Sequence, residues 1–226
     1  MEHNKRVNDI ASHFDFEAPR YDLLLKFFPG YGSSIDEVVR LVPKPGVSLL
    51  DLGTGTGILP FRLKDYFQHL IGVDISPKMI DLCNRLKSDN GVDNCEFKVG
   101  DITDTIYPEE SFDVIVSGYT FHHLEDNLKT QIMLNSQRML KNGGCFVFCD
   151  YMKKQVPPSL KESIPYLINE LGRRVILLFE GDLFNEDEFP ITLEDYTRML
   201  TDSGFRNITC LNFKYTTDAV FIAFKS

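Results

Sequence analysis

Long apolar runs are absent from this sequence. No stretch approaches the ~18 to 20 apolar residues that a membrane-spanning helix requires. The first ten residues, MEHNKRVNDI, contain no apolar core of the kind that signal peptides carry. We therefore expect a soluble protein that works in the cytoplasm, with no membrane as partner.

An excess of basic residues is also absent. The 226 residues include 24 Lys and Arg against 33 Asp and Glu, which gives a formal net charge of -9. Because nucleic-acid-binding proteins usually gather basic residues into a dominant patch, this balance argues against nucleic acid as a partner. A small molecule is the expected ligand, and a homodimer is a possible assembly.

Cysteine is sparse and odd in number. Two of the five cysteines, Cys145 and Cys149, lie four residues apart on an expected strand. That spacing separates them by roughly 13 Å, too far for both to bind one metal ion. We predict no metal site and expect reduced, mostly buried thiols rather than a disulfide framework. The complete set is Cys83, Cys95, Cys145, Cys149 and Cys210.

Strand-like and helix-like segments alternate through the middle of the chain, which is typical of a parallel sheet with helices on both faces. The expected strands cover residues 47–53, 69–75, 95–101, 112–118, 144–151, 207–213 and 219–225. The expected helices cover residues 58–67, 77–86, 128–140 and 193–203. Asn142-Gly143-Gly144 is expected to end the third of these helices. The last two strands alternate and are joined by a short turn, so they predict an antiparallel hairpin at one edge.

A glycine-rich loop follows the first expected strand, in the run Asp51-Leu52-Gly53-Thr54-Gly55-Thr56-Gly57. Ligands of open α/β sheets bind beyond the carboxyl ends of the strands. Glycines at alternate positions let the backbone turn sharply and approach a ligand, and the next helix directs its free N–H groups there. A dinucleotide fingerprint would require Gly or Ala at position 58, where Ile58 stands, so the loop argues against a pyrophosphate ligand.

Carboxylates stand at the ends of the first three expected strands, as Asp51, Asp74 and Asp101. Asp74 is placed to accept hydrogen bonds from both hydroxyls of a ribose, and Asp101 from the exocyclic amine of an adenine. Three carboxylates with no basic residue among them suit a cofactor that carries an ammonium and a sulfonium better than one that carries a diphosphate.

The runs LLDLGTGTG, GVDISPKMI, GDITD and FDVIVSGYTFHHLED resemble, in order and spacing, the consecutive motifs of class I S-adenosylmethionine-dependent methyltransferases. The resemblance covers roughly residues 47–150. It implies S-adenosylmethionine as cofactor, S-adenosylhomocysteine as product, and in-line transfer of a methyl group to an oxygen, nitrogen or carbon atom of a small metabolite. It also implies a Rossmann-like, doubly wound fold whose mostly parallel sheet has seven strands.

The resemblance assigns residues to parts of the cofactor. Gly53, Gly55 and Gly57 would line the methionine moiety and Asp74 would hold the ribose. Met79 would pack near the adenine, with Asp101 and Ile102 beside it. The full candidate set for cofactor binding is Tyr21, Asp51, Gly53, Gly55, Gly57, Asp74, Ile75, Met79, Asp101, Ile102 and Ser117.

The segments on either side of this core are expected to cover the site. Ala18-Pro19-Arg20-Tyr21-Asp22 resembles a short segment with which many of these enzymes cover the cofactor, and Tyr21 is either a ligand of the methionine carboxylate or a core aromatic. We predict one domain over residues 1–226. It divides into an N-terminal helical cap (1–45), a cofactor-binding core (46–151), a substrate-side lid (152–190), and a C-terminal helix with the edge hairpin (191–226).

Methyl transfer occurs at an activated carbon, so the protein chiefly has to align the acceptor and exclude water. Where the acceptor must lose a proton, a neutral histidine would serve as base. His122 resembles in placement the base of small-molecule O-methyltransferases and is the candidate catalytic residue. A pocket-forming or structural histidine is the alternative.

Two other functions are compatible with the fold. Phe28-Pro29-Gly30-Tyr31 resembles a segment of carboxy-S-adenosylmethionine synthases, which belong to transfer-RNA modification, although those enzymes have a less glycine-rich first motif. A non-catalytic protein that keeps the fold and the cofactor site is the third possibility.

Overall fold

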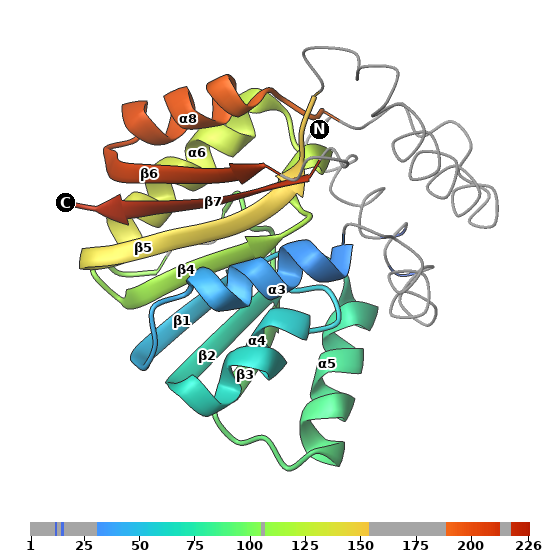
Figure 1. The fold of residues 1–226 in the computed structure, drawn as a ribbon. Coiled ribbons are helices and arrows are strands. Elements are labelled where there is room, and N and C mark those ends of the chain that lie inside the picture. Colours follow the sequence, from blue (N-terminus) through green and yellow to red (C-terminus); the bar gives the residue numbers. More distant parts are fainter. Residues whose placement is uncertain (1–11, 13–14, 16–30, 105–106, 154–188, 213–217) are drawn as a thin grey trace.

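A seven-stranded sheet forms the centre of the computed structural model, which describes residues 12, 15, 31–104, 107–153, 189–212 and 218–226. The strand order is β3-β2-β1-β4-β5-β7-β6 (Figure 1). Strands β1 to β5 pair in parallel, whereas β7 is antiparallel to both of its neighbours, β5 and β6. The predicted doubly wound fold with an antiparallel edge hairpin is confirmed.

The strands lie close to the predicted ranges. They are β1 (Gly46–Leu52), β2 (Phe67–Asp74), β3 (Cys95–Val99), β4 (Phe112–Gly118), β5 (Leu140–Tyr151), β6 (Phe205–Asn212) and β7 (Asp218–Lys225). The described helices are α3 (Tyr31–Leu41), α4 (Ile58–Leu63), α5 (Pro77–Asp89), α6 (Asp126–Met139) and α8 (Leu193–Asp202). Two short 3₁₀ helices, η1 (Lys64–Tyr66) and η2 (Phe121–His123), complete the described elements.

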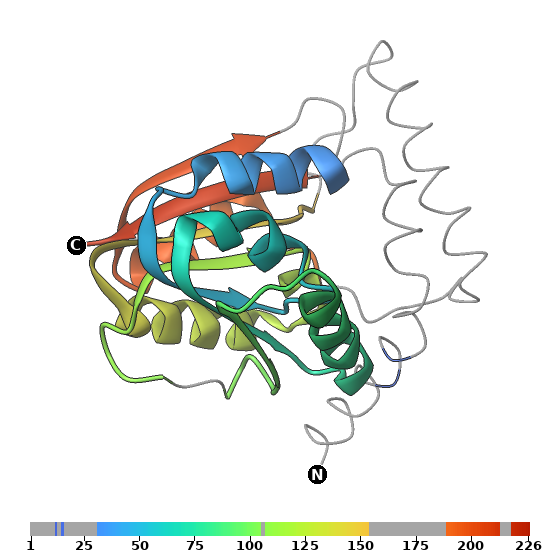
Figure 2. The ribbon, with the colours of Figure 1, turned by 90° about the horizontal axis from the view of Figure 1, so that it is seen from below.

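Helices cover both faces of the sheet because the side chains of its central strands alternate between two cores. Leu49 and Leu50 are neighbours on β1 and both are fully buried, yet they belong to different clusters. Leu49 packs with residues of α3, α4 and α5, and Leu50 packs with residues of α6 and α8. Figure 2 shows α3 and α4 on one side of the strands and α6 on the other.

One predicted boundary is wrong. Asn142-Gly143-Gly144 does not end a helix, because α6 already ends at Met139 and β5 begins at Leu140. Leu140 is fully buried and pairs with Phe112 of β4, so burial in the sheet outweighs helix continuation. Gly143 then has φ +78° inside the strand, and the pairing with β4 shifts register between Phe112 and Val114. The glycines allow this irregularity in β5.

Parts of the expected cap and lid lie outside the described residues. They include Tyr21, the run Phe28-Pro29-Gly30 and residues 154–188. The division into cap, core and lid therefore stays a prediction. All five cysteines are described as free thiols, four of them buried and Cys210 partly exposed. In the described part of the chain, no helix is both long and apolar enough to cross a membrane.

Candidate cofactor and catalytic site

The loop after β1 folds over the end of β2. The amides of Gly53 and Thr54 both donate to the carbonyl of Val73, at 2.9 Å each. Gly53, Gly55 and Gly57 have φ of +73°, +52° and +80°, in the left-handed region that favours glycine. A Cβ on Gly53 would also lie only 2.4 Å from the side chain of Thr120. Position 53 therefore requires glycine for two reasons, its left-handed backbone and its close contact with the segment after β4.

An open hollow lies beside this loop. It is bordered by the end of β1, Gly118 at the end of β4, and Ile35 of α3. Strand β1 pairs with β2 on one side and with β4 on the other, so the hollow lies where the strand order reverses. This is the position at which open α/β sheets bind their ligands. The loop residues that line it are Asp51, Gly53, Thr54, Gly55, Thr56 and Ile58.

Asp51 presents an unusual carboxylate to this hollow. The residue is 1% exposed, and among the described residues its Oδ1 atom has no hydrogen-bond partner. Burial raises the pKa of Asp51 to about 7, against the opposing effect of the nearby Thr54 side chain, and the charge of Asp74 adds to the rise. Buried polar atoms are nearly always paired, so an unpaired carboxylate oxygen on a pocket wall is suited to a cationic ligand.

Asp74 connects the glycine loop to α5. Its Oδ2 accepts a hydrogen bond from the amide of Gly55 at 2.8 Å, and its Oδ1 accepts one from the amide of Ser76 at 2.9 Å. Burial raises the pKa of Asp74, and these backbone donors oppose that rise. The carboxylate keeps further acceptor capacity on both oxygens, since each has two lone pairs.

A residue from the N-terminal segment reaches the same corner. Asp15 Oδ1 accepts a 2.6 Å hydrogen bond from the hydroxyl of Ser76 and a 3.1 Å bond from the amide of Lys78. Ser76 is the N-cap of α5, and its hydroxyl oxygen accepts from the amide of Met79. Asp15 therefore complements the positive end of the α5 dipole next to Asp74.

The residues predicted to surround the adenine lie near Asp74 and differ in burial. Met79 and Ile102 are buried, and Ile75 is partly buried between Asp74 and Ser76. Asp101 lies close to Asp74 because the amide of Gly100 donates to the Asp74 carbonyl at 2.8 Å. Asp101 Oδ1 also accepts from both the amide and the hydroxyl of Thr103, at 2.8 Å each.

Ser117 and Gly57 make hydrogen bonds that stabilise the backbone around the hollow. The Ser117 hydroxyl donates to the carbonyl of Leu52 at 2.7 Å and so ties β4 to β1. Gly57 is the N-cap of α4, and its amide donates to the carbonyl of Thr54 at 2.8 Å. Tyr21 lies outside the described residues.

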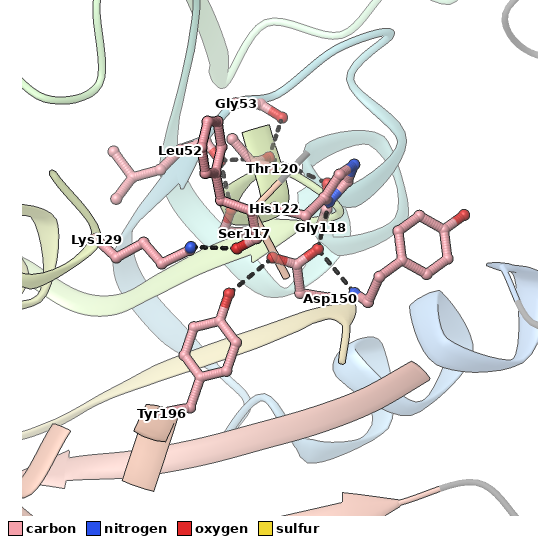
Figure 3. A network of polar contacts seen from close by, with 11 residues as sticks. Leu52, Gly53, Ser117, Gly118, Thr120, His122, Lys129, Asp150 and Tyr196 are labelled. Atoms are coloured by element: carbon pink, nitrogen blue, oxygen red, sulfur yellow. Dashed lines mark hydrogen bonds and ion pairs between the residues drawn. The ribbon is translucent and has the colours of Figure 1, made fainter. Parts of the chain in front are cut away.

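The candidate base, His122, belongs to a buried polar network (Figure 3). Its Nδ1 lies 2.5 Å from Oδ1 of Asp150, the carboxylate near the end of β5. The same oxygen accepts the amide of Tyr151 at 2.8 Å, and the other carboxylate oxygen accepts the Tyr196 hydroxyl at 3.0 Å. Burial raises the pKa of Tyr196 well above its usual value, and the charge of Asp150 acts in the same direction. Tyr196 therefore stays a hydrogen-bond donor to Asp150.

The backbone before His122 contacts the glycine loop. Thr120 Oγ1 lies 3.4 Å from the Leu52 carbonyl and 3.5 Å from the Gly53 carbonyl. Tyr119 has φ +53°, which a non-glycine residue rarely adopts, and its amide donates to the carbonyl of Cys149 at 2.9 Å. The strained turn brings η2, which carries His122, against the loop that follows β1.

Sequence reasoning missed Asp150, Tyr196, Thr120 and Asp15. Asp150 follows the apolar run Phe146-Val147-Phe148-Cys149, so the rule that found carboxylates at earlier strand ends could have found it. Tyr196 offers no local signal, because it meets Asp150 across 46 positions of the chain. Among the described residues, no group of three or more His, Cys, Asp or Glu side chains could hold a metal ion.

Comparison with known proteins agrees with this geometry. A family model described as a methyltransferase domain matches residues 43–204, more than two thirds of the chain. Phosphoethanolamine N-methyltransferase 1 of Arabidopsis thaliana is 31% identical over 181 residues, which are 79% of this chain and 33% of that protein. Demethylmenaquinone methyltransferase of Chlorobaculum parvum is 26% identical over an alignment of 238 positions, which covers 98% of this chain and 94% of that protein.

The fold is shared with solved structures. The phosphoethanolamine N-methyltransferase 2 of Haemonchus contortus, in complex with S-adenosyl-L-methionine, aligns with a TM-score of 0.66 at 16% identity, over 86% of this chain and 52% of that one. Several curated relatives are longer proteins, and the chain spans between 29% and 46% of the length of five of them. From the family match, the sheet order and the glycine loop, the chain belongs to the class I S-adenosylmethionine-dependent methyltransferases.

Proposed function

We propose that this protein transfers the methyl group of S-adenosylmethionine to a small-molecule acceptor, at the hollow between β1 and β4. The observation that carries the proposal is the buried Asp51 carboxylate, whose unpartnered Oδ1 lies beside a loop of left-handed glycines. A buried anion of this kind is costly unless a cation pairs with it. The α-ammonium of S-adenosylmethionine is such a cation.

The surrounding residues fit the rest of that molecule. Gly53 and Gly55 leave the loop without side chains where the methionine moiety would lie. Asp74 retains acceptor capacity for the ribose hydroxyls, and Asp101 lies next to it for the adenine amine. Met79 and Ile102 supply buried apolar surface for the adenine ring. When bound, S-adenosylmethionine supplies an electrophilic methyl carbon with a neutral thioether as leaving group.

The chain's own contribution is to position the acceptor and to exclude water. Aligning two reactants in a closed site is worth several kcal/mol of barrier and needs no covalent intermediate. His122 lies in η2, which follows β4, the strand that borders the hollow, and is the candidate acceptor of a proton. A small metabolite as substrate is supported by the relatives, whose names include phosphoethanolamine and demethylmenaquinone methyltransferases.

Calorimetry tests the cofactor directly. We expect the wild-type protein to bind S-adenosylmethionine and S-adenosylhomocysteine with a Kd on the order of 1 μM, near -8 kcal/mol. Asp51→Asn should weaken both ligands at least tenfold, whereas Glu96→Gln, an exposed change on β3, should leave them unchanged. A folded wild-type protein that binds neither ligand would refute the proposal.

An acceptor screen tests the reaction. Phosphoethanolamine, catechol and reduced menadione represent nitrogen, oxygen and aromatic-carbon acceptors. Release of S-adenosylhomocysteine and a gain of one methyl mass on a probe identify methyl transfer. A protein that binds the cofactor but never releases S-adenosylhomocysteine, with these or a wider acceptor set, would instead be the non-catalytic alternative.

A further inference from the structure

His122 is held in place through both its side chain and its backbone. Its Nδ1 contacts Asp150 Oδ1 at 2.5 Å, and its carbonyl accepts the amide of Phe189 at 2.6 Å. The carbonyl of Phe189 in turn accepts a hydrogen bond from the ammonium of Lys129, which is fully buried on α6. Few conformations are left to a side chain restrained in this way, so its ring orientation is set before any ligand binds.

The partners of Asp150 determine which nitrogen of His122 carries the proton. The amide of Tyr151 and the hydroxyl of Tyr196 both donate to the Asp150 carboxylate, which is fully buried. With Asp150 acting as acceptor on both oxygens, the close His122 Nδ1 is the third donor. A neutral imidazole with its proton on Nδ1 has its lone pair on Nε2.

That second nitrogen lies on the side of the ring away from Asp150 (Figure 3). Among the described residues, the hydrogen-bond partner shown for the His122 ring is Asp150, which contacts Nδ1. Thr120, two residues earlier, contacts the Gly53 carbonyl of the cofactor loop. The segment that carries His122 therefore contacts the loop beside the proposed methyl donor site.

We propose that Asp150 and Tyr196 are positioning residues that hold His122 as its Nδ1–H tautomer, so that Nε2 accepts a proton from a hydroxyl or ammonium group of the methyl acceptor. The proposal rests on the proposed function and narrows its substrate class to acceptors that lose a proton. The acceptor oxygen or nitrogen forms a bond to the methyl carbon while the carbon–sulfur bond breaks and its electron pair stays on sulfur. The acceptor proton moves to Nε2, and the Asp150 carboxylate stabilises the resulting imidazolium.

The groups that face His122 come from several elements. Asp150 and Tyr151 belong to β5, with the Tyr151 ring centroid 4.9 Å from that of His122. His123 is adjacent, at 3.9 Å between centroids. Tyr196 reaches Asp150 from α8, and Lys129 of α6 acts through the Phe189 carbonyl. Asp150 is the carboxylate in direct contact with the His122 ring, so its removal is the sharpest perturbation.

Nitrogen NMR of the free protein tests the positioning without any cofactor. With ¹⁵N-labelled histidine, and with His122→Gln to assign the signals, we expect neutral His122 to be protonated on Nδ1. Asp150→Asn should convert a large fraction of the molecules to the other tautomer, and Tyr196→Phe should do so to a smaller extent. Lys129→Met, which leaves the Asp150 contact intact, should keep the Nδ1–H tautomer. An Nε2–H tautomer in the wild type would overturn the proposal.

Kinetics with whichever probe acceptor is methylated test the chemical role. His122→Gln and Asp150→Asn should lower kcat by about 10²-fold or more, the scale of general base catalysis, with Kd for S-adenosylmethionine unchanged. Tyr196→Phe should lower kcat roughly tenfold and move the acidic limb of the kcat–pH profile. A purely structural network would lower stability without moving that limb, and this result would refute the proposal.

The experiments also distinguish a variant that fails to fold from a failure of the proposed function. If Asp150→Asn does not fold, Tyr196→Phe carries both measurements, because it removes a single hydroxyl. If the wild type has the Nδ1–H tautomer but binds no S-adenosylmethionine, the proposed function and the proton-acceptor role both fail, while the positioning by Asp150 stands.

Discussion

The amide of Gly55 donates a 2.8 Å hydrogen bond to Oδ2 of Asp74, so the carboxylate that ends β2 holds the glycine loop that follows β1. The other oxygen of Asp74 accepts the amide of Ser76 at the start of α5. One side chain therefore fixes the two backbone segments between which the cofactor would lie. Substitutions of graded severity can separate the role of Asp74 in the loop from its proposed role in binding.

Asp74→Asn and Asp74→Ala provide that gradation. Asparagine keeps one acceptor oxygen but turns its NH₂ toward one of the backbone amides, and alanine removes both acceptors. Each unsatisfied amide costs about 1–3 kcal/mol, so we expect alanine to lower the free energy of unfolding more than asparagine. Both should weaken S-adenosylmethionine binding at least tenfold. Urea unfolding and calorimetry measure the two effects, and exposed Asp89→Asn on α5 is the control. Equal binding by all variants would exclude Asp74 as a ligand.

The buried Asp51 carboxylate should make the free energy of unfolding depend on pH. Burial raises its pKa to about 7 from the ordinary 3.8, so between these values the folded protein holds a proton that the unfolded chain has lost. The contribution of Asp51 to the free energy of unfolding therefore falls as the pH rises from about 4 to 7. Asp51→Asn should be more stable than the wild type at pH 8, by on the order of 1–3 kcal/mol, with a smaller difference at pH 5. Urea unfolding at the two pH values measures this, and a difference that does not grow with pH would contradict it.

Gly53 and Gly91 form a matched pair for the loop. Both have positive φ, +73° and +60°, but a Cβ on Gly53 would meet Thr120 at 2.4 Å whereas one on Gly91 has no atom within 4 Å. Gly91→Ala should cost about 1–2 kcal/mol of stability from backbone strain alone. Gly53→Ala adds the clash, so it should cost more and abolish cofactor binding. Thermal unfolding and calorimetry of both variants check this, and equal effects would show that the contact with Thr120 is unimportant.

Lys129 anchors the chain that returns to the site. Its ammonium is fully buried and donates to the Phe189 carbonyl and, at 3.0 Å, to Asp126. Lys129→Met conserves the apolar stem but leaves the Phe189 carbonyl without this donor, which should cost about 1–3 kcal/mol. In this variant, amide hydrogen exchange at Phe189, whose N–H donates to the His122 carbonyl, should accelerate more than exchange in the core strands β1 and β4. Thr130→Ala, the next position on α6, is the control, and uniform acceleration across the chain would contradict local anchoring.

Much of the fold was predictable because its signals are local. The apolar runs of β1, β4 and β5 and the Ser76-Pro77 helix start depend on neighbouring residues only. The glycines at 53, 55 and 57 follow β1, and the carboxylates at 51 and 74 lie in the last two residues of β1 and β2, positions that the sequence shows directly. The boundary near Gly143 was wrong because the burial of Leu140 in the sheet, a tertiary effect, decided it.

Local sequence was enough to predict the class of sheet, the glycine loop and the acidic residues around it, since each depends on residues close together along the chain. The contacts of Asp150 with His122, 28 positions away, and with Tyr196, 46 positions away, depend on the packing of the folded chain. Folding alone brings β5 and α8 to the end of β4, because each buries its apolar surface against the same core. The hydrogen-bond partners of a buried polar side chain are set by that packing.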